Sequence, residues 1–206
     1  MNLLILNIRV PIFLVAFASL ASAQEAKTMK PNPVTHTFYI TNVENEPGAA
    51  AIIASVKKVK SVTDVKLKPG DGFAQVSFDT HAVTHHQIAQ AIADAAAPGT
   101  KPYMVSIRRN VPAYAEGDNA AKVDAIFAKA KDYFKVITLD REKGQFEFQF
   151  LPLKVDPKNE GLQGWSGMTT GHALADPPPK GLGLKWQVVI EGQAVQPAKK
   201  IGGASK

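Results

Sequence analysis

The pattern of apolar and polar residues near the start of the chain has a period of two. Phe38 and Ile40 fall on the same face as His36, and mostly polar residues fill the other face of the stretch from 35 to 41. Alternation of this kind is typical of a half-buried strand. We therefore predict a strand over residues 35–41.

The period then lengthens after a short polar segment. Ile52, Val56 and Val59 recur at helical spacing, and Pro47 precedes them at a position that the first turn of a helix tolerates. The pattern predicts a helix of about four turns over residues 49–62.

The rest of the first half uses the same two patterns. Alternating runs at 62–67 and 74–78 flank the turn-forming residues 68–72, which predicts a β-hairpin. Thr84 begins a capping-box sequence followed by apolar residues at helical spacing, and a last alternating run lies at 103–108. The order β-α-β-β-α-β is that of a ferredoxin-like α+β domain, with two helices on one face of an antiparallel sheet.

We place this ferredoxin-like domain at residues 35–110 and a second α+β unit at 111–192. The second unit begins with apolar residues at helical spacing, and two alternating runs up to residue 150 then predict a hairpin. Residues 151–180 are rich in glycine and proline and predict a long loop, which alternation at 182–190 follows as a last strand.

Two interpretations of the second unit remain open. The segments 47–78 and 118–150 have nearly the same length and order of elements, so the second unit could be a degenerate copy of the first, of the form αββ-β. A helix followed by a hairpin is also a common arrangement. The alternative is therefore a single α+β domain with a C-terminal extension.

The first 23 residues are typical of a secretory signal peptide, with Arg9, an uncharged apolar run and a small-residue motif before Gln24. We expect export to the periplasm or the cell exterior. Residues 24–34 then form a polar linker and residues 193–206 a polar tail. No second apolar run has the length of about 20 residues that crosses a bilayer, so we expect no membrane span after cleavage.

The chain has no cysteine, which excludes disulfides, thiolate metal ligands and a cysteine nucleophile. Its formal net charge is +6, but basic residues are spread along the chain without interleaved aromatic residues, so we expect no nucleic-acid partner. No phosphate-binding loop, His-Glu-x-x-His sequence or nucleophile elbow is present, and we therefore expect no enzymatic activity.

The apolar positions of the first half also have a distinctive spacing. They stand, with their flanking polar residues, at Phe38, Ile40, Ile52, Val56, Val59, Val62, Val65, Leu67, Phe78, Asp79, Val83, Thr84, Ile88 and Ile92. This spacing resembles that of the heavy-metal-associated (HMA) domain, the module of copper chaperones and of the soluble domains of copper-transporting ATPases. The resemblance covers about a third of the chain and implies the fold rather than an activity.

The resemblance places the two metal-binding cysteines of the family at Asn45 and Gly48. Neither an amide nor a glycine replaces the thiolates that select Cu(I), so we expect no metal site of the family type in this loop. A protein built on this scaffold has either kept metal binding through other ligands or lost it.

Four of the five histidines lie in the first half, at His36, His81, His85 and His86. In the predicted fold the first strand begins beside the end of the third, and the second helix starts at the same pole. We predict a histidine cluster there, opposite the vacant loop, that could bind Zn(II), Cu(II) or Ni(II). The alternative is a set of surface histidines near a helix start.

A second candidate metal site lies in the glycine-rich stretch around residue 167. Met168 and His172 stand four residues apart there, and exported copper proteins use methionine and histidine ligands. The alternative is that Met168 packs under Trp165 as an ordinary apolar contact.

Two functions follow from these observations. The first is an exported, non-catalytic protein that handles copper or zinc through histidine rather than cysteine. The alternative is a metal-free module that holds another exported protein through its sheet edges or through the loop 151–180.

Overall fold

The computed structural model describes residues 31–192 apart from residues 42, 159 and 160. The predicted signal peptide, most of the linker after it and the polar tail lie outside this part of the chain. Within it, no helix is long and apolar enough to cross a membrane.

The first half of the chain has the predicted order of elements, and its sheet order is β2-β3-β1-β4 with all neighbours antiparallel. The split βαβ topology predicted for this half is therefore present. The elements are β1 (Pro33–Ile40), α1 (Glu46–Lys57), β2 (Val62–Leu67), β3 (Phe73–Asp79), α2 (His85–Ala93) and β4 (Val105–Asn110).

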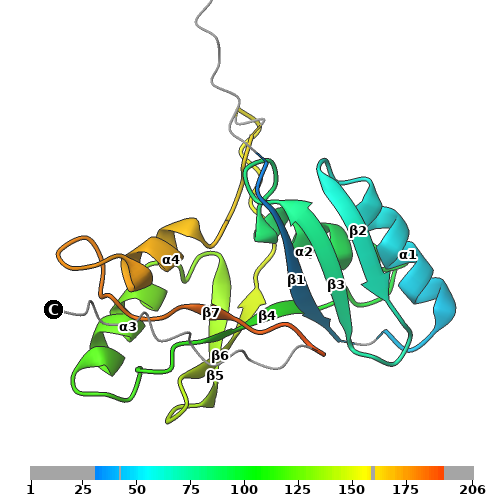
Figure 1. The fold of residues 1–206 in the computed structure, drawn as a ribbon. Coiled ribbons are helices and arrows are strands. Elements are labelled where there is room, and N and C mark those ends of the chain that lie inside the picture. The colour runs from blue at the N-terminus through cyan, green and yellow to red at the C-terminus, as the bar shows by residue number, and fades with distance from the viewer. Residues whose placement is uncertain (1–30, 42, 159–160, 193–206) are drawn as a thin grey trace, which may run out of the picture.

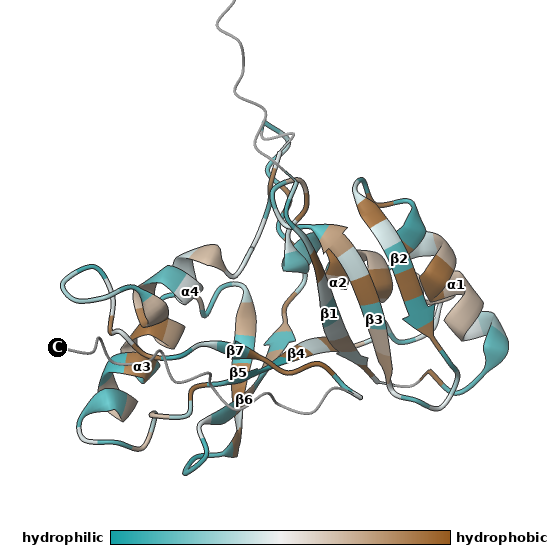
Figure 2. Ribbon diagram, in the orientation of Figure 1, coloured by the Kyte–Doolittle hydropathy of each residue, from teal (hydrophilic) through white to brown (hydrophobic). Residues whose placement is uncertain are grey.

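Local capping decides where the two helices of this half begin. The Asn45 side chain accepts a hydrogen bond from the Gly48 N–H, so α1 starts at Glu46, earlier than its apolar pattern indicates. Thr84 and Gln87 exchange both bonds of a capping box at the start of α2. Figure 2 shows the alternation of hydrophobic and hydrophilic residues along β2 and β3 that turns one face of each strand to the core.

The second half extends the same sheet rather than building a separate one, because β6 pairs with β4 and β5 pairs with β6. The α+β class is confirmed: the described residues form one seven-stranded antiparallel sheet with four helices (Figure 1). The elements of this half are α3 (Asn119–Ala128), β5 (Phe134–Asp140), β6 (Gln145–Phe150), α4 (Met168–Ala175) and β7 (Gln187–Val188).

Two details predicted for this half were wrong. The segment 151–180 is not a continuous loop, because it contains α4; Gly171 conceals the helical pattern and lies against the Trp186 ring, where an added Cβ would be 3.5 Å from Cδ1. The run 182–190 is a strand only at β7. Its earlier backbone N–H groups, at Leu182 and Leu184, donate to the carbonyls of Ala173 and Leu174 at the end of α4 instead of to a strand.

Strand β4 lies at the centre of the sheet and has three neighbours. One edge pairs with β6. The other edge pairs with β1 at its start, through Val105 and Ser106, and with β7 at its end, through Arg109 and Asn110. The two strands β1 and β7 therefore share one edge of β4, and the two halves of the molecule meet there.

All four helices cover the same face of the sheet. Ile107 of β4 lies beside Phe148 of β6 in register, and Phe127 of α3 packs on Phe148 with ring centroids 5.0 Å apart. His85 of α2 contacts Arg109 on that face of β4, and α1 and α4 pack beside α2 and α3. One hydrophobic core therefore fills the space between the helices and the sheet, and no helix of the described residues lies on the opposite face (Figure 1).

Candidate functional site

The loop before α1, where the HMA resemblance places two cysteines, is occupied by structural contacts. The Asn45 Oδ1 atom accepts the Gly48 N–H at 2.8 Å as the helix cap. A Cβ added to Gly48 would lie 2.9 Å from the Tyr103 hydroxyl and 3.1 Å from Asn45 Oδ1. Any side chain at position 48 would therefore have to displace Tyr103, and the only side-chain oxygen at these two positions already serves the helix.

The predicted histidine cluster is present in part, at the opposite pole. His36 on β1 and His85 at the start of α2 bring their Nε2 atoms to 3.1 Å from each other. Both side chains are buried, with His36 6% and His85 4% exposed. Their rings meet edge to face with centroids 4.3 Å apart, and Trp165 closes over His85 at 5.5 Å.

Arg109 of β4 completes this group. It is 2% exposed, and its Nη2 atom lies 3.4 Å from His36 Nδ1 and 3.5 Å from His85 Nε2. Its Nη1 donates to the Arg108 carbonyl at 3.0 Å, while its Nε has no hydrogen-bond partner. No carboxylate of the described residues forms an ion pair with it.

The hydrogen bonds define which imidazole nitrogens carry protons. An arginine only donates, so Nδ1 of His36 accepts from Arg109 and its proton sits on Nε2. That proton is then donated to Nε2 of His85, whose own proton sits on Nδ1, an atom without a partner of good geometry. Both imidazole lone pairs are therefore already used inside the protein, and neither points to a vacant position.

Burial and the guanidinium act together on these groups. Burial first and the charge of Arg109 second lower the pKa of His85 to about 3, against an opposing contribution from a hydrogen bond with the Ser166 backbone. The pKa of His36 is lowered strongly, first by burial and then by His85 and Arg109. Burial also lowers the pKa of Arg109 to about 9, so the pair is neutral beside a cation at neutral pH.

The other two histidines of the predicted cluster lie elsewhere. His86 follows His85 on α2, and successive helical residues point about 100° apart. Its Nε2 lies 2.7 Å from the Leu151 carbonyl, its ring packs on Phe150, and burial lowers its pKa. His81 lies in the turn after β3, where its backbone N–H donates to Asp79 Oδ1 at 2.9 Å. Among residues 31–192 as described, no group of three or more His, Cys, Asp or Glu side chains could hold a metal ion.

The second predicted pair lies on α4, on the surface. Met168 is the first residue of the helix and 45% exposed, and His172 follows one turn later with its side chain 65% exposed. The Nδ1 atom of His172 is 3.2 Å from Oδ1 of Asp176, a further turn along the same face. The carboxylate accepts the Nδ1 proton, so the lone pair of His172 is on Nε2, to which no described group bonds.

Three residues that matter at these sites were not predicted from the sequence. Arg109 continues the alternation of Val105 and Ile107, which was enough to place it on the buried face. Asp176 stands four residues after His172, a signal that depends on recognising α4. The position of Tyr103 against Gly48 is a tertiary contact between segments far apart in the chain, and no local pattern indicates it.

This chain resembles a few solved protein structures, all at low sequence identity. No family model and no curated protein matches the chain. A solution structure of a candidate copper-ion-binding protein from Bacillus anthracis str. Ames is 25% identical, with 37% of this chain and 99% of that chain covered and a TM-score of 0.33. The water-soluble region of the P-type ATPase CopA from Bacillus subtilis is 13% identical, with 60% and 80% covered and a TM-score of 0.34.

A second structure of the N-terminal soluble domains of Bacillus subtilis CopA is 14% identical, covers 63% of this chain and 86% of that chain, and has a TM-score of 0.33.

Proposed function

We propose that this protein is an exported, non-catalytic metal-handling protein that holds one soft metal ion through histidine and thioether instead of cysteine. The observation that carries the proposal is the arrangement on α4. His172 Nδ1 lies 3.2 Å from the Asp176 carboxylate, and Met168 stands one turn earlier on the same exposed face. A carboxylate on the distal nitrogen of a metal-binding histidine fixes its tautomer and raises its basicity.

The electrostatic surroundings favour α4 over the buried pair of His36 and His85. A cation bound to His85 Nε2 would sit within a few ångströms of the Arg109 guanidinium. At an effective dielectric of about 20, two unit charges about 4 Å apart repel by about 4 kcal/mol. Asp176 has the opposite charge, so it attracts an ion bound at His172.

The ligand types select the ion. A thioether and a neutral imidazole are soft and borderline ligands, which suits Cu(I) better than Zn(II). Two protein ligands leave an ion accessible from solvent. An accessible ion can pass to another exported protein, which is the partner class we propose for this surface.

The test is an anaerobic titration of the mature protein with Cu(I) against a chromogenic competitor. We expect one saturable equivalent for the wild type, and binding at least about tenfold weaker for Met168→Leu and for His172→Gln. His81→Gln is the matched control, because it removes a histidine away from α4. Wild-type binding no tighter than millimolar, or equal affinities for all four proteins, would reject the proposal.

Export and internal duplication belong to the same proposal. Amino-terminal sequencing of the protein recovered outside the cytoplasm is expected to begin at Gln24.

The strand order β5-β6-β4-β7, with α3 after β4 and α4 before β7, supports the second half as a degenerate copy of the first. In that arrangement β4 is the last strand of one copy and the first of the next.

A metal-free interaction module is the second candidate, and one surface feature favours it. A cavity of about 630 Å³ opens between the end of α2, the segment before β4 and the end of β6, and its lining is mostly apolar. Met104 and Leu151 are exposed at this cavity. The test is capture of exported proteins by the wild type and by Met104→Asp, since identical partners for both would argue against the surface.

A further inference from the structure

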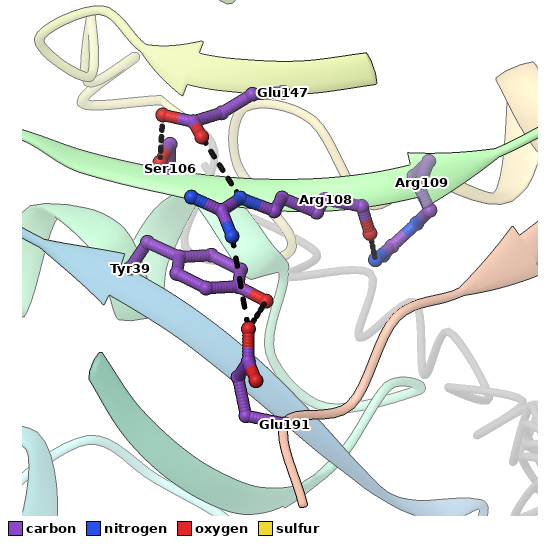
Figure 3. A network of polar contacts seen from close by, with 6 residues as sticks. All are labelled: Tyr39, Ser106, Arg108, Arg109, Glu147 and Glu191. Atoms are coloured by element: carbon purple, nitrogen blue, oxygen red, sulfur yellow. Dashed lines mark hydrogen bonds and ion pairs between the residues drawn. The ribbon is translucent and has the colours of Figure 1, made fainter. Parts of the chain in front are cut away.

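Beyond β7 the chain lies on the helix-free face of the sheet, where Glu191 is bound by several side chains. All three polar parts of this residue are bound. Its N–H donates to Thr37 Oγ1 at 3.1 Å, its carbonyl accepts from Gln75 Nε2 at 2.8 Å, and its carboxylate accepts from the Tyr39 hydroxyl at 2.6 Å. Figure 3 shows Glu191 meeting Tyr39 and Arg108.

The groups that hold Glu191 lie on β1, β3 and β4. Arg108 Nη1 lies 3.7 Å from the Glu191 carboxylate and supplies a positive charge. Thr37 is fully buried although it faces away from the helices. Together these groups recognise an extended residue by its backbone and by a negative side chain.

This receptor is held in place without the segment that occupies it. The Arg108 guanidinium stacks on the Tyr39 ring at 3.8 Å, and its Nε donates to Glu147 Oε2 at 3.0 Å. Glu147 in turn accepts from the Ser106 hydroxyl at 2.8 Å. The ion pair of Arg108 with Glu147 is shorter than the one with Glu191, at 3.0 Å against 3.7 Å, so we expect Arg108 to keep its position when Glu191 leaves.

The bound segment itself has few other attachments to the sheet. β7 contributes two residues of pairing and a side-chain hydrogen bond in which Asn110 Nδ2 donates to Gln187 Oε1 at 3.3 Å, and beyond it Val189 donates to the Arg108 carbonyl at 3.4 Å. Glu191 and Arg108 each remain about a third exposed. A short segment with a charged, partly solvated anchor is readily displaced.

We propose that the helix-free face is a docking surface for an extended acidic segment of another exported protein, and that Glu191 occupies it in the absence of that partner. The partner presents a glutamate in an extended backbone after aliphatic residues, as Val189, Ile190 and Glu191 do. This proposal is independent of metal binding on α4, which lies on the opposite, helical face.

The test uses a synthetic peptide with the sequence of residues 186–192 and a terminal fluorescent label, whose anisotropy reports binding to the protein. The tethered segment competes at a high effective concentration in the wild type. We expect the peptide to bind the Glu191→Ala chain at least about tenfold more tightly than the wild type or the control Glu142→Ala, which alters an exposed glutamate of the β5–β6 turn.

A second peptide with glutamine in place of the glutamate tests the role of charge. Loss of one charge-assisted contact is expected to weaken its binding about tenfold or more, and Arg108→Gln in the Glu191→Ala background is expected to do the same. Thermal unfolding and circular dichroism are the measurements that check whether the variants are folded. Glu191→Gln, which keeps the side-chain volume, replaces Glu191→Ala if that chain is unstable.

Three outcomes would overturn the proposal. The first is the absence of saturable peptide binding to either Glu191 variant up to millimolar concentration. The second is equal affinity for the two peptides, which would show that the carboxylate is not recognised. The third is a concentration-dependent dimer of the wild type that Glu191→Ala abolishes, which would identify the occupant as the same segment of a second copy.

Discussion

His85 and His172 each stand on a helix beside one charged residue, and the rest of their surroundings differ. His85 is buried against aromatic rings, its neighbour is the cation Arg109, and its Nε2 lone pair accepts a bond from His36. His172 is exposed, its neighbour is the anion Asp176, and its Nε2 bonds to no group of the described residues. The charge and the solvent around a histidine therefore decide whether it can hold a metal ion, rather than how many histidines lie nearby.

The largest consequence of this difference is a pH dependence of stability that comes from the buried pair. The pKa of His85 falls from its ordinary 6.5 to about 3 on folding, so between these values the unfolded chain binds more protons. The free energy of unfolding therefore falls as the pH is lowered through this window, and the contribution of His85 levels off below about pH 3. At about 1.4 kcal/mol per pKa unit, the loss is of the order of a few kcal/mol.

Urea unfolding at pH 7 and at pH 4.5 measures this fall in the free energy of unfolding. Both pH values lie above the range in which the hydrogen-bonded aspartates become protonated. The pKa values of Asp79, Asp118 and Asp140 are lowered from 3.8 by their hydrogen bonds, so these groups lose their contribution at lower pH. A chain with His36→Gln and His85→Gln should show a flatter profile. An unchanged profile in that chain would assign the acid sensitivity to other groups.

Replacing each histidine by alanine should change the free energy of unfolding by different amounts at the two sites. His85→Ala leaves a cavity beneath Trp165 and removes the acceptor of the His36 proton, and we expect a loss of about 2–3 kcal/mol. His172→Ala removes only an exposed pair with Asp176, and we expect a change within about 0.5 kcal/mol. Equal losses in urea unfolding would mean that α4 depends on its surface pair more than its exposure indicates.

The fold of the first half was predictable from sequence because its signals are local. Alternation, helical spacing, the Thr84 capping box and the turn at 68–72 each act over a few residues and agree with one another. The second half was predicted less well. Gly171 interrupts the apolar pattern of α4 and lies against Trp186, a residue farther along the chain. The first part of the predicted last strand bonds the end of α4 instead of a strand.

The candidate site was predictable only at the level of residue type. The spacing placed His36 and His85 at one pole, where they meet, because the ferredoxin-like topology fixes which strand and helix ends coincide. The sequence pattern could not exclude His86 from the predicted cluster, because the direction of the His86 side chain depends on the exact start of α2. It also omitted Arg109, whose buried charge changes what the pair can bind.

A smaller effect is expected at the carboxylate of the exposed site. If Asp176 orients and polarises His172, Asp176→Ala should weaken Cu(I) binding by about tenfold, and Asp176→Asn, which still accepts the Nδ1 proton, by less. The competitor titration that measures wild-type affinity also measures this ranking. A control at Asp118, which pairs with Lys122 on α3, should leave the affinity unchanged. If Asp176→Asn weakened Cu(I) binding more than Asp176→Ala, the proposed role of the Asp176 carboxylate would be rejected.

A small change in stability is also expected when the buried charge of Arg109 is replaced by an apolar side chain of similar size. Arg109→Met keeps most of the side-chain volume and removes a desolvated cation that no described carboxylate neutralises, and replacements of buried charges by apolar residues are often neutral or stabilising. The His36 Nδ1 atom loses its donor, which opposes the gain. We therefore expect urea unfolding of this variant within about 1 kcal/mol of the wild type, whereas Arg109→Ala, which leaves a cavity, should lose about 2–4 kcal/mol. A loss above 3 kcal/mol for Arg109→Met would instead mean that the guanidinium is compensated by a bound anion or ordered water. In that case the buried group of His36, His85 and Arg109 would bind an anion, whereas the surroundings of His172 attract a cation.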